Sequence, residues 1–95
     1  MHIQLTAHAR LRIQQRGIPD QMMNWLVSHG EKFYDGRGGL IRFFSQRVLR
    51  KLKSQVDPES FRKILENRRC YLVLSASDGA VITVGKLFPG RRVRH

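Results

Sequence analysis

The sequence has few of the residues on which disulfide-bonded, secreted or membrane-spanning proteins depend. Cys70 is the only cysteine, so the chain cannot form an internal disulfide or a cysteine-based zinc site. The longest apolar run, residues 71–74, is far shorter than the ~20 residues that a membrane span needs. No apolar signal region follows Met1. We therefore expect a cytoplasmic protein that does not enter the membrane.

Acidic residues are also scarce, which argues against several kinds of catalytic site. The chain has 7 Asp and Glu against 18 Lys and Arg. No close pair of carboxylates lies at the end of an expected strand, and no histidine-rich ligand spacing occurs. We therefore expect neither a two-metal nuclease site nor a zinc site, and no cofactor. The Gly-x-Ser-x-Gly pattern of serine hydrolases is absent as well.

The resulting net charge of +11 is the most informative property of the composition. A net charge of about 2–8 is enough to keep a small domain in solution. The excess therefore indicates a polyanionic partner, with RNA or the ribosome as the first candidate and an anionic membrane surface as the weaker one.

The length of 95 residues predicts one domain, residues 1–95. A first helix is expected from residue 7 to about 15, with Thr6 as its N-cap and Gly17 after its end. A second helix should begin at Pro19 and end at Gly30, and its two methionines and Trp25 are expected to pack in the core.

The remainder alternates between strand and helix patterns. Residues 32–35 and 40–44 read as strands around a glycine-rich turn. A third helix is expected over 46–55 after Ser45, and a fourth from Pro58 to about 67 with Asp57 as N-cap. Residues 70–75 and 80–85 read as strands, both expected in the interior of the sheet. The sequence thus predicts an α+β fold in the order ααββααββ, with helices packed on one small antiparallel sheet.

Basic residues gather in the middle of the chain and in its C-terminal tail. Residues 36–56 include no acid and six basic residues, and a solvated helix face usually mixes the two signs. This pattern suits contacts to phosphates, which give affinity without reading sequence. The predicted nucleic-acid contacts are Arg47, Arg50, Lys51 and Lys53 of the third helix and Arg91, Arg92 and Arg94 of the tail.

One reaction fits a basic protein that has histidines and no metal site, namely cleavage of RNA through its own 2′-hydroxyl. Histidine, with a pKa near 6.5 as a residue type, can transfer protons at neutral pH. Arginine and lysine stabilise the charge that develops on the phosphorus centre. His8 is the best placed histidine, because Arg12 and Gln15 share its side of the first helix. Alternatively, His8 and Arg12 are structural polar residues that hold this helix on the sheet.

Residues 8–18 fit the pattern H-A-x-x-R-x-x-x-R-G-I, and residues 78–84 fit D-G-x-V-I-T-V. In both motifs and in the order of its elements the chain resembles a family of small prokaryotic domains of unknown function, which are grouped with the RelE/barnase-like RNase toxins. The resemblance covers nearly the whole chain. It implies a RelE/barnase-like fold and a toxin-like, metal-independent endoribonuclease acting on mRNA or tRNA, with an acidic antitoxin protein as a possible partner.

The opening motif of that family falls on His8, Arg12 and Arg16. Together with Lys86 these are the predicted catalytic residues, His8 for proton transfer and the cations for phosphate contact. Relatives are expected to carry a histidine at the position of Lys86. If that histidine is their general acid or base, this chain either is inactive or uses Lys86 differently. Two alternatives need no histidine chemistry: a non-catalytic nucleic-acid or ribosome-binding module, and an interaction domain for an acidic protein.

Overall fold

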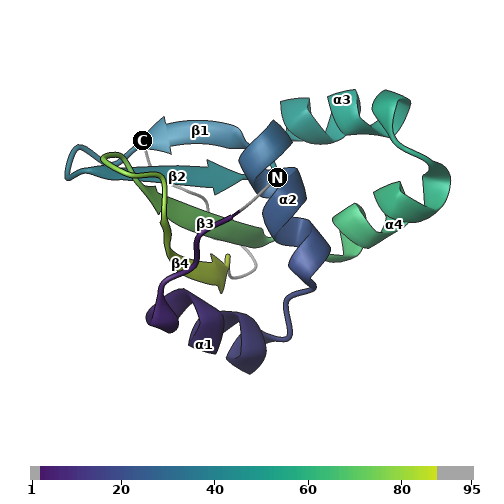
Figure 1. Cartoon of the computed structure of the whole chain (residues 1–95). Coiled ribbons are helices and arrows are strands. Elements are labelled where there is room, and N and C mark those ends of the chain that lie inside the picture. The colour runs from purple at the N-terminus through teal and green to yellow at the C-terminus, as the bar shows by residue number, and fades with distance from the viewer. Residues whose placement is uncertain (1–2, 88–95) are drawn as a thin grey trace.

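The structure, a computed structural model, describes residues 3–87 and contains four helices and four strands in that range (Figure 1). Their order, ααββααββ, confirms the predicted α+β fold. The elements are α1 (Ala7–Arg16), α2 (Asp20–His29), β1 (Glu31–Tyr34), β2 (Gly39–Phe43), α3 (Gln46–Gln55), α4 (Pro58–Glu66), β3 (Cys70–Ser75) and β4 (Val81–Lys86).

Three of the helices begin at the caps that the sequence predicts. The side-chain oxygens of Thr6, Ser45 and Asp57 each accept a hydrogen bond from a backbone N–H in the first turn of α1, α3 and α4. The α1 helix ends at Arg16, one residue later than expected, because Gly17 adopts the left-handed conformation with φ 62°. Short polar side chains and one glycine therefore set these boundaries locally.

The four strands form an antiparallel sheet in the order β1-β2-β3-β4. The prediction that both C-terminal strands lie in the interior of the sheet is correct for β3 and wrong for β4, which is the last strand of the ladder. The outer side of β4 is covered, however. Thr6 N donates to Val81 O (3.1 Å), Val81 N donates to Gln4 O (2.8 Å), and α1 packs along the strand. This cover explains why an edge strand has the apolar composition of an interior one.

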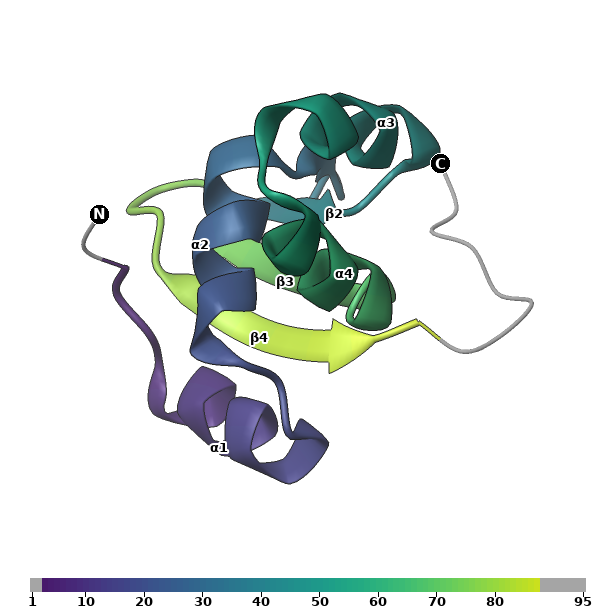
Figure 2. The ribbon, with the colours of Figure 1, turned by 90° about the vertical axis from the view of Figure 1, so that its right-hand side faces the viewer.

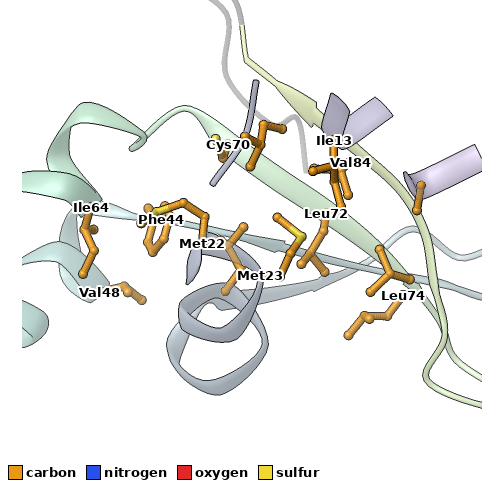
Figure 3. Packing of buried hydrophobic residues seen from close by; sticks show 14 of the residues in the cluster. Ile13, Met22, Met23, Phe44, Val48, Ile64, Cys70, Leu72, Leu74 and Val84 are labelled. Carbon is orange, nitrogen blue, oxygen red and sulfur yellow. The ribbon is translucent and has the colours of Figure 1, made fainter. Parts of the chain in front are cut away.

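Helices α2, α3 and α4 lie on one face of the sheet, while α1 lies beside β4 (Figure 2). The core forms between these layers, and Met22 of α2, Ile64 of α4, Leu72 of β3 and Val84 of β4 belong to its buried cluster (Figure 3). The expected core role of the methionines is confirmed, since Met22 and Met23 are both buried. Trp25 is partly buried against the same cluster.

One cation of the basic stretch, residues 36–56, is buried in this core region. Side chains alternate between the two faces of the sheet along β2, and that of Arg42 lies on the helix-covered face, where Arg42 pairs with Leu72 of β3. Arg42 is only 6% exposed. Its Nε donates to Gly30 O (3.2 Å) at the end of α2. Burial lowers the pKa of the guanidinium, and the nearby Glu31 carboxylate acts in the opposite direction. Arg42 therefore joins α2 to the sheet and is not available to a nucleic acid.

Candidate nucleic-acid interface

Helix α1 runs beside β4 in the same direction (Figure 2), and its start is fixed to the start of that strand. The Thr6 hydroxyl donates to Ile82 O (3.0 Å) and accepts from Ala9 N (3.1 Å). Ala9 and Ile13 are the buried residues of the helix. The neighbouring side of the helix, on which His8 and Arg12 follow one another by one turn, thus lies at the border between the buried stripe and solvent.

Of the predicted catalytic residues on α1, His8 and Arg16 are exposed and Arg12 is partly buried. No carboxylate of residues 3–87 forms an ion pair with either arginine. The two arginines therefore have no acidic partner among the described residues, and their charge remains available to a phosphate.

Lys86 lies at the far end of β4 from the point where α1 begins. It follows Ile82 by four residues, which corresponds to about 13 Å along a strand. Arg16 follows His8 by eight residues, or about 12 Å along a helix. Because α1 and β4 run side by side in the same direction, Arg16 lies toward the same end as Lys86 and His8 toward the opposite end. The structure therefore separates His8 from Lys86 instead of gathering the predicted set at one point.

A pocket of about 300 Å³ opens at the Lys86 end of the sheet, which we call the β4-end pocket. It is formed by the turn between α4 and β3 and by the end of β4, and is lined by Glu66, Asn67, Arg68, Arg69, Cys70 and Lys86. Sequence reasoning missed Arg68 and Arg69. The available signal was the pair of adjacent arginines before a strand whose first residue, Cys70, pairs with Lys86.

A second hollow, of about 410 Å³, lies between the end of α2, the start of β1 and α3; we call it the α3 cleft. Arg47 donates to both carboxylate oxygens of Glu31, and Ser45 Oγ donates to the same group (2.9 Å). These bonds, from Arg47 first and Ser45 second, lower the pKa of Glu31. Arg47 is thus held in an ion pair, while Lys51 lines the cleft without one among the described residues.

His29 also lines the α3 cleft, and its ring lies 5.7 Å from that of Trp25. It stands in the last turn of α2, where a structural role is expected from the sequence. The remaining predicted contacts of α3, Arg50 and Lys53, are exposed on the outer side of the helix. The predicted contacts Arg91, Arg92 and Arg94 lie outside the described residues.

Most cations of the protein have no acidic partner in the described part of the chain. Three of the 18 Lys and Arg residues fall outside residues 3–87, which leaves fifteen. Of these, only Arg47 and Arg62 form ion pairs, with Glu31 and Glu66 respectively. Because Arg42 is buried, the other twelve present a strongly positive surface to solvent.

Residues 3–87 contain no cluster of three or more potential metal ligands, and none of their helices is long and apolar enough to cross a membrane. Comparison of the chain with family models, with curated proteins and with solved structures finds no match.

Proposed function

We propose that this protein binds RNA through the phosphate backbone, with the exposed side of α3 as a principal contact. The observation that carries this proposal is the unmixed charge of α3. The helix has no acidic residue, and Arg50, Lys51 and Lys53 are exposed without an ion pair to any described residue. Cations on a rigid helix match phosphates spaced along a strand and give affinity that depends strongly on salt.

The choice of RNA over other polyanions rests on the family resemblance of the two sequence motifs. That resemblance also supports a RelE/barnase-like arrangement and an acidic antitoxin that competes with RNA for the same cations. The cytoplasmic location is proposed from the single cysteine and the lack of an apolar signal region. A positively charged surface attracts an acidic protein for the same electrostatic reason that it attracts RNA.

Charge reversal on α3 tests the proposal. The Arg50→Glu/Lys51→Glu variant should bind a single-stranded RNA oligonucleotide at least about tenfold more weakly, and its plot of log affinity against log salt should be shallower by roughly 1.4, for two lost contacts. Fluorescence anisotropy at several salt concentrations measures both quantities. The matched control is Lys32→Glu/Arg37→Glu, which changes the net charge equally at the β1–β2 end. Equal losses in both variants would mean that only the total charge matters, and α3 would not be an interface.

A second candidate function is metal-independent cleavage of the bound RNA at α1. The observation that favours it is the exposed imidazole of His8 one turn before Arg12, an arginine with no ion pair among the described residues. In this reaction the RNA 2′-oxygen attacks the adjacent phosphorus and the 5′-oxygen leaves. A 2′,3′-cyclic phosphate and a 5′-hydroxyl result. His8 would accept the proton of the 2′-hydroxyl, water would donate a proton to the leaving 5′-oxygen, and Arg12 would stabilise the charge on the phosphoryl oxygens. Arg16, two turns beyond His8 along α1, would contact a neighbouring phosphate of the strand.

Cleavage assays with EDTA present test this second candidate. His8→Gln should lower the rate by about 10²–10⁴ while leaving RNA affinity nearly unchanged. His29→Gln, a histidine in the α3 cleft, serves as the control and should retain the rate. If EDTA stops cleavage, or if His8→Gln cleaves normally, His8 is not the proton-transfer group. If the wild-type protein binds RNA without cleaving it, the protein is a non-catalytic nucleic-acid or ribosome-binding module.

A further inference from the structure

We infer that the β4-end pocket is a binding site for a single phosphate group, held by Arg68, Arg69 and Lys86. The pocket is separate from α3, because no residue of α3 lines it. A phosphate can therefore bind here whether or not RNA binds along α3.

Backbone hydrogen bonds hold together the segments that carry the cations of the pocket. Leu87 N donates to Arg69 O (2.8 Å), and Cys70 N donates to Asn67 O (3.0 Å). The ladder between β3 and β4 pairs Cys70 with Lys86. The turn that carries the two arginines is thus tied to the end of the strand that carries the lysine, which reduces the entropy lost when all three cations bind one ligand.

The end of α4 does not oppose an anion in this pocket as strongly as a bare helix C-terminus would. The last carbonyls of a helix carry partial negative charge. Here Asn67 N donates to the Lys63 and Ile64 carbonyls, and Asn67 Nδ2 donates to Lys63 O (2.9 Å). Arg68 Nη1 donates to Leu65 O (2.9 Å), which places a guanidinium at the helix end. The side chains of the turn therefore satisfy these carbonyls and offset their charge.

The charges that line the pocket are strongly unbalanced. Glu66 is its only carboxylate, and it pairs with Arg62 (3.4 Å), a cation that does not itself line the pocket. The Cys70 thiol is buried, and this burial raises its pKa, so it remains neutral at pH 7. Three cations and one carboxylate thus line the pocket, and none of the three cations forms an ion pair with a described residue.

This charge suits a phosphomonoester better than an internal phosphodiester. A monoester carries roughly 1.5–2 negative charges at pH 7, against one for a phosphodiester. Arginine forks also bind two phosphate oxygens at once, and the lysine adds a third donor. We therefore expect the site to prefer the terminal phosphate of a strand over a phosphate within it.

Titration of the full-length protein with inorganic phosphate at constant ionic strength tests the site directly. Phosphate, but not the same concentration of chloride, should shift the backbone amide NMR signals of residues 67–70 and 86–87. The Arg69→Gln/Lys86→Gln variant should weaken phosphate binding at least about tenfold, because it removes two charged hydrogen-bond donors. Arg50→Gln/Lys51→Gln removes the same charge from α3 and should bind phosphate as the wild type does. Absence of the shifts in the wild type, or equal weakening in both variants, would overturn the inference.

Two RNA oligonucleotides identical except for a 5′-phosphate or a 5′-hydroxyl distinguish the two sources of phosphate. A terminal-phosphate site predicts tighter binding of the phosphorylated strand, and Arg69→Gln/Lys86→Gln should remove this preference. If both strands bind equally and the variant weakens both, the site holds an internal phosphodiester and the preference for a monoester is wrong. Loss of RNA binding by α3 variants with phosphate shifts intact would bear on α3 alone, so the two proposals fail separately.

Discussion

The α3 cleft and the β4-end pocket are both lined by cations and by one glutamate, yet they differ in what those cations can do. In the α3 cleft, Glu31 receives two hydrogen bonds from Arg47 and a third from Ser45. In the β4-end pocket, Glu66 has one longer contact, to Arg62 outside the pocket. The number of cations around a hollow therefore does not by itself give the charge available to a ligand. That charge also depends on whether each carboxylate pairs with a cation that lines the hollow or with one outside it.

The largest expected effect comes from destabilising α4, the helix that ends at the β4-end pocket, and so removes one side of this comparison. Ile64 of α4 is fully buried in the core. Ile64→Ala should lower the free energy of unfolding by about 2–5 kcal/mol, because it removes buried methyl groups and leaves a cavity. Urea denaturation measures the loss. Leu65→Ala, on the same helix but 37% exposed, is the control and should cost clearly less. Equal costs would mean that Ile64 does not anchor α4.

A smaller effect sharpens the comparison by making the α3 cleft resemble the β4-end pocket. Glu31→Gln removes the carboxylate and releases Arg47, so α3 should bind RNA a few-fold more tightly and with a salt dependence steeper by up to about 0.7. Fluorescence anisotropy measures both. Glu66→Gln removes the same charge at the other site and serves as the matched control. Weaker RNA binding by Glu31→Gln would show instead that Arg47 needs its carboxylate partner in order to be positioned.

The smallest effect concerns stability in acid. The bonds from Arg47 and Ser45 lower the pKa of Glu31 from its ordinary value of 4.5. A carboxyl whose pKa is lowered on folding stabilises the folded state above its unfolded pKa, and this contribution disappears as the pH falls through the folded value. Because Arg47 is largely exposed, less than about 1 kcal/mol is expected. Urea unfolding between pH 7 and pH 3 should show a smaller loss in Glu31→Gln than in the wild type; parallel curves would count against this contribution.

The parts of the fold that were predicted correctly depend on local signals. Thr6, Ser45 and Asp57 satisfy the first turn of their helices by contacts within three residues, so their role can be read from the sequence. The position of β4 depends on a contact across most of the chain, between Val81 and the backbone of residues 4–6. Its apolar composition could not distinguish cover by another strand from cover by α1.

The candidate sites show the same division. The exposed cations of α3 follow from the helical period and from the absence of acids. Arg42 belongs to the same basic stretch, but the alternation along β2 places it under the helices. Arg68 and Arg69 were missed because only the sheet brings their turn to the end of β4. The tertiary structure decides whether a cation is exposed to solvent, paired with a carboxylate or buried in the core. The charge pattern of the sequence does not distinguish these three cases.

The attachment of the N-terminal segment to β4 also has a consequence for how the protein is made. The hydrogen bond between Thr6 and Ile82 joins residues 76 positions apart, and α1 rests on the strand that contains Ile82. During synthesis α1 therefore has no surface to dock on until β4 has left the ribosomal exit tunnel, and contacts so distant in sequence form slowly. The helix that carries His8 and Arg12 therefore takes its final place only after β4 has emerged, so a nascent chain lacks the proposed RNA-cleaving arrangement until then.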